Sequence, residues 1–179
     1  MGKEKKNILI SGLPGIGKTT LIKEIYAQIK DSHPVGFYTE EIRNESQRKG
    51  FQLMGLDGST AIFAHILIES PHHVGKYRVD VEAFDRFLTS FDFSNKKRPV
   101  IIDEIGKMEC LSSKFVSLVS QVFDSDNLVI ATISHTDGGI KGKIKQRDDV
   151  ELFKMNLDNR NSLSKEILEV INTYSLAQQ

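Results

Sequence analysis

The chain has 179 residues, in which 24 lysines and arginines are balanced by 24 aspartates and glutamates, so no overall charge favours nucleic acid or an anionic membrane. The length suits one domain over residues 1–179. The single cysteine, Cys110, excludes an internal disulfide and a cysteine-built zinc site, and no apolar stretch is long enough to span a membrane. We therefore expect a soluble, cytoplasmic protein.

The first predicted elements are a strand over residues 7–11 and a helix over about residues 18–30, joined by a glycine-rich loop. The loop matches the pattern GxxxxGK[ST] from Gly12 to Thr19. Glycines let consecutive backbone N–H groups wrap around an anion, and the helix that follows adds the positive end of its dipole. This pattern predicts binding of nucleoside triphosphates.

Each fixed residue of the loop has an expected role. Lys18 is expected to reach the β- and γ-phosphates, and the hydroxyl of Thr19 is expected to hold Mg²⁺. The predicted nucleotide-binding residues of this segment are Gly12, Leu13, Pro14, Gly15, Ile16, Gly17, Lys18, Thr19 and Thr20.

Strand and helix patterns alternate along the rest of the chain. In chain order we predict strands at 35–42 and 51–56, a helix at about 81–91, a strand at 100–102, a helix at about 113–123, strands at 128–133 and 151–155, and a helix at about 162–174. The polar turn 43–50 makes the first two strands a hairpin inserted early in the fold, whereas residues 59–68 give no clear pattern. This alternation predicts an α/β fold in which a mostly parallel sheet has helices on both faces and binds its ligand at the carboxyl ends of the strands.

A second chemical signal is the apolar strand over residues 100–102, which ends in Asp103 and Glu104 as a Walker B element does. Two carboxylates at the end of a buried strand are costly unless a cation lies nearby, and Mg²⁺ held by Thr19 is the obvious candidate. We expect Asp103 to belong to the metal site. Glu104 is expected to lie at the nucleotide and to accept the proton of the attacking water.

Further stretches of the chain carry a resemblance to a known family. They are Gly36 to Arg43, Arg48 to Phe51, Val74 to Tyr77, Val79 to Asp80, Asp103 to Glu109, and Asn159 to Asn161. Across nearly its whole length the sequence resembles the cancer-related nucleoside-triphosphatase family, first described from thermophiles. The resemblance implies a P-loop fold like that of the RecA-type and AAA-type ATPases, and Mg²⁺-dependent hydrolysis of several nucleoside triphosphates. The chain departs from the family pattern at Cys110 and in loop 135–143.

Two catalytic roles have more than one candidate in the sequence. Glu104 is the preferred general base because it directly follows the strand, and Glu109, about one turn further on, is the alternative. Lys107 is a candidate for the cation that an arginine finger supplies in other enzymes, and a solvated lysine is the competing interpretation.

Other polar residues at the expected active edge have weaker assignments. Arg43 and Arg48 flank the hairpin turn, and exposure to solvent is favoured over contact with phosphate. The basic segment 142–147 is a candidate lid over bound nucleotide, and a solvated helix face is favoured. His135 follows a strand that ends at this edge and is a candidate ligand contact.

Hydrolysis of ATP, GTP and other nucleoside triphosphates to diphosphate and phosphate is the preferred function, and two other classes are alternatives. A P-loop kinase for a small molecule or a nucleotide fits the loop and the chain length, although nothing marks an acceptor pocket. A regulatory GTP switch fits the DxxG match at Asp103 to Gly106, but Arg98 stands where the guanine-reading NKxD motif requires aspartate. We expect nucleoside triphosphates as partners, neither membrane nor nucleic acid, and a monomer with an oligomer as the alternative.

Overall fold

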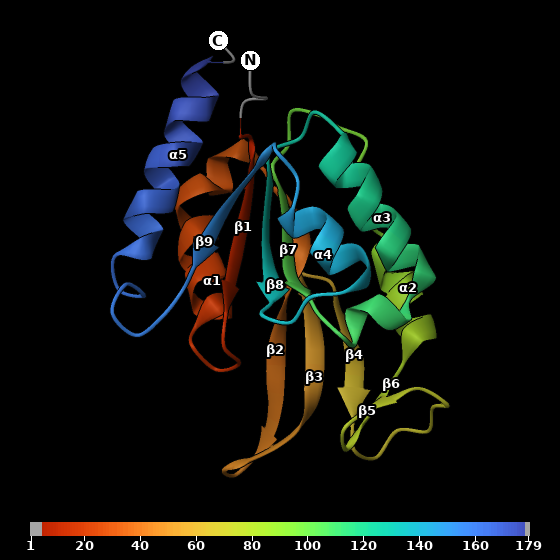
Figure 1. Ribbon diagram of the computed structural model, residues 1–179. Helices are drawn as coiled ribbons and strands as arrows, with labels where there is room; N and C mark the ends of the chain where they lie inside the picture. The colour runs from red at the N-terminus through yellow and green to blue at the C-terminus, as the bar shows by residue number, and fades with distance from the viewer. Residues whose placement is uncertain (1–4, 178–179) are drawn as a thin grey trace.

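The computed structural model describes residues 5–177, which form one sheet of nine strands with helices against it (Figure 1). The strands are β1 (Asn7–Gly12), β2 (Val35–Asn44), β3 (Gln47–Gly55), β4 (Thr60–His65), β5 (His73–Val74), β6 (Tyr77–Val79), β7 (Val100–Ile105), β8 (Val129–Ser134) and β9 (Val150–Lys154). The helices are α1 (Lys18–Ile29), α2 (Val81–Thr89), α3 (Ser113–Asp124), α4 (Gly139–Lys145) and α5 (Leu163–Ala177), with short 3₁₀ turns η1 (Lys30–Ser32) and η2 (Glu109–Leu111).

The sheet has a parallel half and an antiparallel half, in the order β5-β6-β4-β3-β2-β7-β8-β1-β9. Strands β2, β7, β8, β1 and β9 run parallel to one another. From β2 outward, β3, β4, β6 and β5 pair antiparallel, so that β4, β6 and β5 extend the expected hairpin. In Figure 1 the β2–β3 hairpin projects beyond the rest of the sheet at the edge where the loop after β1 lies.

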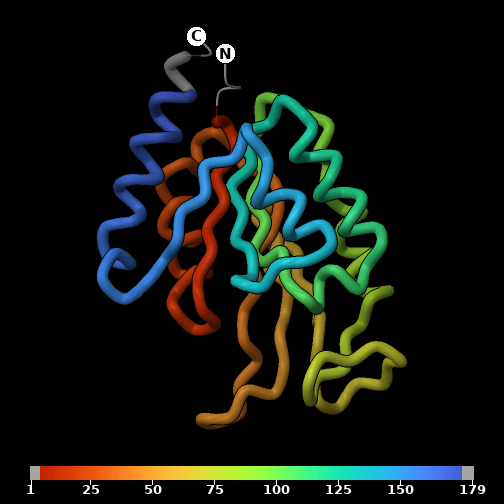
Figure 2. Tube along the Cα trace, in the orientation of Figure 1, coloured from red at the N-terminus to blue at the C-terminus, as the bar shows by residue number. Residues whose placement is uncertain are grey.

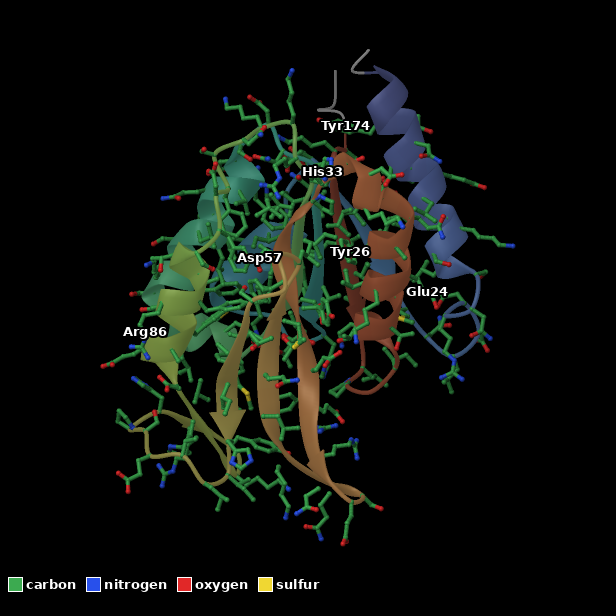
Figure 3. The ribbon with its side chains drawn as sticks, turned by 180° about the vertical axis from the view of Figure 1, so that it is seen from behind. Glu24, Tyr26, His33, Asp57, Arg86 and Tyr174 are labelled. Carbon is green, nitrogen blue, oxygen red and sulfur yellow. The ribbon has the colours of Figure 1, made fainter. Side chains whose placement is uncertain are left out.

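Helices cover both faces of the parallel half because its strands are apolar on both sides. On β1, Ile8 and Ile10 pack with α1 and α5, whereas Leu9 belongs to the core formed with α2, α3 and α4. Figure 3 shows the first of these faces, with α1, which carries the labelled Tyr26 and Glu24, in front of the strands and α5 beside it. In the same view β3 has no helix in front of it.

The predicted elements occur in the structure with shifted ends. The hairpin turn is shorter than the predicted turn 43–50, because both strands continue to Asn44 and Gln47 and only Glu45 and Ser46 are left between them. Polar composition suggested a longer loop, but these polar residues pair across the two strands. The segment 59–68, which had no clear pattern, supplies β4. Among the described residues, no helix is both long enough and apolar enough to cross a bilayer.

A glycine allows the two halves of the sheet to join. Gly36 on β2 has φ 131°, and a Cβ atom placed there would lie 1.9 Å from the carbonyl oxygen of Ile101 on β7. Any other residue would therefore separate β2 from β7. Because β2 also carries Thr39, which contacts the candidate site described below, this close approach positions the site.

We predict that Gly36→Ala lowers the free energy of unfolding by about 3 kcal/mol or more, because the new Cβ meets backbone that cannot move away. Gly58→Ala is the matched control: Gly58 also has a positive φ, 88°, but a Cβ there meets nothing within 4 Å. Its cost should be only the backbone strain, about 1–2 kcal/mol. Urea unfolding measures both, and equal losses in the two variants would contradict the role of the Gly36 contact.

Candidate functional site

The site lies where the parallel strands end. Figure 2 shows the loops that follow β1, β7, β8 and β9 at the same end of the sheet. Parallel strands place their carboxyl ends along one edge, where ligands of open α/β sheets bind. The predicted glycine-rich loop and the predicted acids therefore meet at this edge, as the sequence indicated.

The loop after β1 wraps around the start of α1. Gly15 and Gly17 have positive φ angles, 77° and 113°, so the loop needs glycine at these two positions. Gly17 is the N-cap of α1 and provides no side-chain acceptor for the first N–H groups of the helix. These N–H groups are thus available for an anion at the positive end of the helix dipole.

Lys18 is buried at the first position of α1, although its ammonium group is charged. Its Nζ donates to the carbonyl oxygens of Gly12, at 3.1 Å, and Leu13, at 3.4 Å, and lies 3.5 Å from Oε2 of Glu104. The ammonium group is therefore held between the start of the loop and the end of β7, at the mouth of the loop.

Asp103 is the most enclosed acid of the site, with 1% of its surface exposed. Its Oδ2 accepts a hydrogen bond of 2.7 Å from Thr19 Oγ1, and its Oδ1 accepts one of 2.6 Å from Thr132 Oγ1 on β8. The backbone N–H of Thr39 on β2 also donates to Oδ2, at 3.5 Å. Burial raises the pKa of Asp103 above its usual range, and the two hydroxyl groups oppose this shift.

Glu104 and Glu109 lie on either side of the same glycine. A Cβ atom on Gly106 would lie 2.6 Å from Oε2 of Glu109 and 3.1 Å from Oε1 of Glu104. Burial raises the pKa of Glu109 to about 8, and the charges of Glu104 and Asp103 add to this effect. Burial also raises the pKa of Glu104, which Lys18 opposes, but the Glu104 side chain is 33% exposed whereas Glu109 is 7% exposed.

Some predicted residues do not join this group. Lys107 is exposed in the turn before η2, and no hydrogen bond or ion pair within residues 5–177 connects it to the other site residues. Arg43 and Arg48 both form ion pairs with Glu41 on the hairpin. Of the basic segment 142–147, Arg147 binds Asp124 and Asp149, whereas Gly142, Lys145 and Gln146 line the cavity beside the loop after β1.

A cavity of about 790 Å³ adjoins the loop after β1. Its walls come from that loop, from α4 with the segment before it, and from β9 with the segment after it. The apolar lining residues are Leu13, Ile16, Leu152, Met155 and Leu157, and the charged or amide-bearing ones are His135, Asp137, Lys145, Gln146, Lys154, Asn156 and Asp158. The volume is in the range of small-molecule sites, so this cavity has room for the part of a nucleotide beyond its phosphates.

Several contacting residues were not found from the sequence. Thr39 and Thr132 contact Asp103 from β2 and β8, which are separate strands in the chain and neighbours of β7 in the sheet. Thr132 left one signal, a polar residue inside a strand buried on both faces. Thr39 gave no signal through burial, since its strand mixes buried and exposed residues, but it lies within the stretch Gly36 to Arg43 that carries the family resemblance.

Known proteins are similar to this chain over most of its length. The NTPase family matches residues 7–168. The chain belongs to this NTPase family. It is 45% identical over 166 residues to the nucleoside-triphosphatase THEP1 of Thermotoga sp. (strain RQ2), covering 92% of this chain and 94% of the relative. It is 34% identical to the human cancer-related nucleoside-triphosphatase over 183 residues, covering 93% of this chain and 96% of the relative.

Two solved structures of this NTPase family have the same fold. The crystal structure of THEP1 from Aquifex aeolicus superposes with a TM-score of 0.80 at 33% identity, covering 92% of this chain and 98% of that one. The solution structure of a human cancer-related nucleoside triphosphatase gives a TM-score of 0.78 at 33% identity, covering 93% and 97%. The predicted family, the P-loop α/β fold and nucleoside-triphosphatase activity are thereby confirmed.

The raised pKa of Glu109 predicts a pH-dependent difference in stability. Its pKa rises from 4.5 to about 8 on folding, so between these values the unfolded chain loses a proton that the folded chain keeps. The free energy of unfolding therefore falls as pH rises, and Glu109→Gln removes this loss. Relative to wild type, the variant should gain about 1.4 kcal/mol per pH unit across that window.

Urea unfolding at several pH values between about 4.5 and 8 measures this difference. Glu82→Gln serves as the control, because Glu82 is exposed in the first turn of α2. A gap between wild type and Glu109→Gln that stays constant with pH would show that Glu109 is ionised in the folded protein.

Proposed function

We propose that this NTPase converts ATP, GTP and related nucleoside triphosphates to the diphosphate and phosphate in a Mg²⁺-dependent reaction. The observation that carries this proposal is the 2.7 Å hydrogen bond between Thr19 Oγ1 and Asp103 Oδ2, which brings the phosphate-binding loop and the acidic strand end together. The nucleotide-binding residues would be Gly12 to Thr20 together with Asp103 and Glu104.

The donor set at this contact fits Mg²⁺. A hydroxyl oxygen and a carboxylate oxygen are the hard ligands that this ion prefers, and it usually takes only one or two protein ligands besides water and phosphate. Asp103 is buried with a raised pKa, so a cation beside it would stabilise its charged form. Thr19 and Asp103 would hold the ion, which when bound would neutralise charge on the β- and γ-phosphate oxygens.

The chain's own groups would then act on the phosphates and the water. The loop N–H groups and Lys18 would bind the β- and γ-phosphates, because both face the mouth of the loop. Glu104 would accept a proton from the attacking water, since its side chain is partly exposed beside Lys18. Glu109, with a pKa of about 8, holds its own proton near neutral pH and is the poorer base. It would instead limit where the Glu104 carboxylate lies.

The nucleoside would occupy the cavity beside the loop. The cavity begins at the loop residues Gly12, Leu13 and Ile16, so a phosphate tail bound in the loop can continue into it. Apolar walls suit the flat face of a base, and several of the polar side chains in the lining, such as Gln146 and Lys154, are long and flexible. This lining gives a physical reason for accepting more than one base.

We also propose a cytoplasmic location and a monomer, which the lone, half-buried thiol of Cys110 and the neutral net charge fit.

We predict that the purified protein releases phosphate from ATP and from GTP with Mg²⁺ and no acceptor, and that a chelator stops release. The γ-phosphate is then transferred to water, and the rates for nucleotides with different nucleobases should differ little. A coupled phosphate assay across four nucleotides measures this. Phosphate transfer seen only after a nucleoside or a sugar is added would assign the site to a kinase instead.

We predict that Glu104→Gln lowers kcat by about 10²–10⁴-fold and leaves the Kd for the diphosphate within about 2-fold, because the lost group acts only on the water. Lys18→Ala should weaken binding of the triphosphate as well as turnover. Single-turnover kinetics and nucleotide titration separate the two effects. An active Glu104→Gln together with an inactive, folded Glu109→Gln would exchange the roles of the two glutamates.

A further inference from the structure

One cation at the active edge is held by hydroxyl groups rather than by a carboxylate. Lys141, in the first turn of α4, donates from Nζ to Oγ1 of Thr136 at 2.8 Å and to Oγ of Ser134 at 3.2 Å. The two hydroxyl oxygens are 3.1 Å apart. The ammonium group thus rests over the end of β8, and we name Ser134, Thr136 and Lys141 the β8 cluster.

Two other basic residues close to Lys141 in the chain form ion pairs with carboxylates. Lys145 forms an ion pair of 2.7 Å with Asp137, and Arg147 forms ion pairs with Asp124 and Asp149. Lys141 forms no ion pair with a carboxylate in the part of the chain that the structure describes. The carboxylate that acts electrostatically on Lys141, Asp137, is already paired with Lys145, so the direct partners of this ammonium group are two neutral hydroxyl groups that an anion can replace.

The β8 cluster lies between the phosphate-binding loop and the acids. Strand β8 separates β1 from β7 in the sheet, and Ser134 is paired in register with Gly12. The carbonyl oxygen of Gly12 is one of the two that hold Lys18. On its other side the cluster approaches the end of β7, since Ile133, directly before Ser134, is paired in register with Ile105.

The side chain of Lys141 can change its partners while α4 stays in place. The helix is held by Ile144, which is buried in the core, and by Lys145, which is bonded to the segment before the helix. Lysine has four methylene groups, and its contacts here are two ordinary hydrogen bonds that an anionic oxygen can replace. Exchange of two hydroxyl partners for a charged oxygen strengthens the interaction.

We propose that Lys141 is a catalytic residue that binds a γ-phosphate oxygen during hydrolysis, in the role that an arginine finger has elsewhere. The proposal rests on the proposed function. As the oxygen of water bonds to the γ-phosphorus, the bond from that phosphorus to the β–γ bridging oxygen breaks and its electron pair stays on the diphosphate. The water proton passes to Glu104 and then to the product phosphate. Lys141 leaves Ser134 and Thr136 and stabilises the equatorial oxygens while this charge is redistributed.

The test compares Lys141→Gln with Lys143→Gln. Lys143 is two residues further along the same helix, is exposed, and contacts none of the site residues. For Lys141→Gln we expect kcat to fall by about 10²–10³-fold with the Kd for the diphosphate within about 2-fold, whereas Lys143→Gln keeps wild-type values. The affinity gained when aluminium fluoride joins the Mg²⁺–diphosphate complex, as a mimic of the transferred group, should be lost in Lys141→Gln alone.

Lys141→Arg provides a second variant, because it keeps the charge and should retain more turnover than Lys141→Gln. Equal kcat and equal aluminium fluoride affinity in Lys141→Gln and Lys143→Gln would overturn the proposal. So would a Lys141→Gln whose loss of turnover follows a matching loss of diphosphate binding. If wild type itself releases no phosphate without an acceptor, the proposed function fails; if wild type does and Lys141→Gln is unimpaired, only the role of Lys141 fails.

Discussion

The buried carboxylate of Asp103 is the constraint on which the rest of this structure depends. A charged group with 1% of its surface exposed must be hydrogen-bonded from several sides, and here the donors come from α1, β2 and β8. These three elements are separate in the chain and come together around β7. Satisfying one acid therefore aligns the phosphate-binding loop, the hairpin strand and the end of β8, which is the geometry that phosphoryl transfer requires.

Three acids within seven residues of one another are given different properties by their surroundings. Asp103 is enclosed and accepts two hydroxyl hydrogen bonds, Glu104 faces Lys18 and partly faces solvent, and Glu109 is enclosed with a pKa raised to about 8. These different surroundings follow from the path of the chain. Gly106 has no side chain, so the carboxylates of Glu104 and of Glu109, the first residue of η2, can both lie next to it. The three roles that we propose for these acids, as metal ligand, base and neutral acid beside the base, would thus come from one short segment.

What could be read from the sequence is what is local in the chain. The loop, the strand before it and the helix after it are contiguous, so their chemistry and their conformation were both predicted, and β7 with its acids was found for the same reason. Thr39 and Thr132 were missed because their roles depend on the strand order, which places β2 and β8 beside β7. The one-domain organisation of residues 1–179 and the roles of the individual site residues stay predictions.

The cation that we propose to bind the γ-phosphate could likewise not be identified from residues that are close together in the chain. Lys107 is near the acids in sequence, yet the turn before η2 leaves it exposed, whereas Lys141 lies 38 residues beyond Asp103 in the numbering and rests at the adjacent strand end. The positions of these two lysines matter because a bound triphosphate adds negative charge to the site. A triphosphate brings more negative charge than Lys18 and one divalent ion neutralise, and Asp103 and Glu104 add to the deficit. An ammonium group bonded to Ser134 and Thr136 would supply a further positive charge within one copy of the chain.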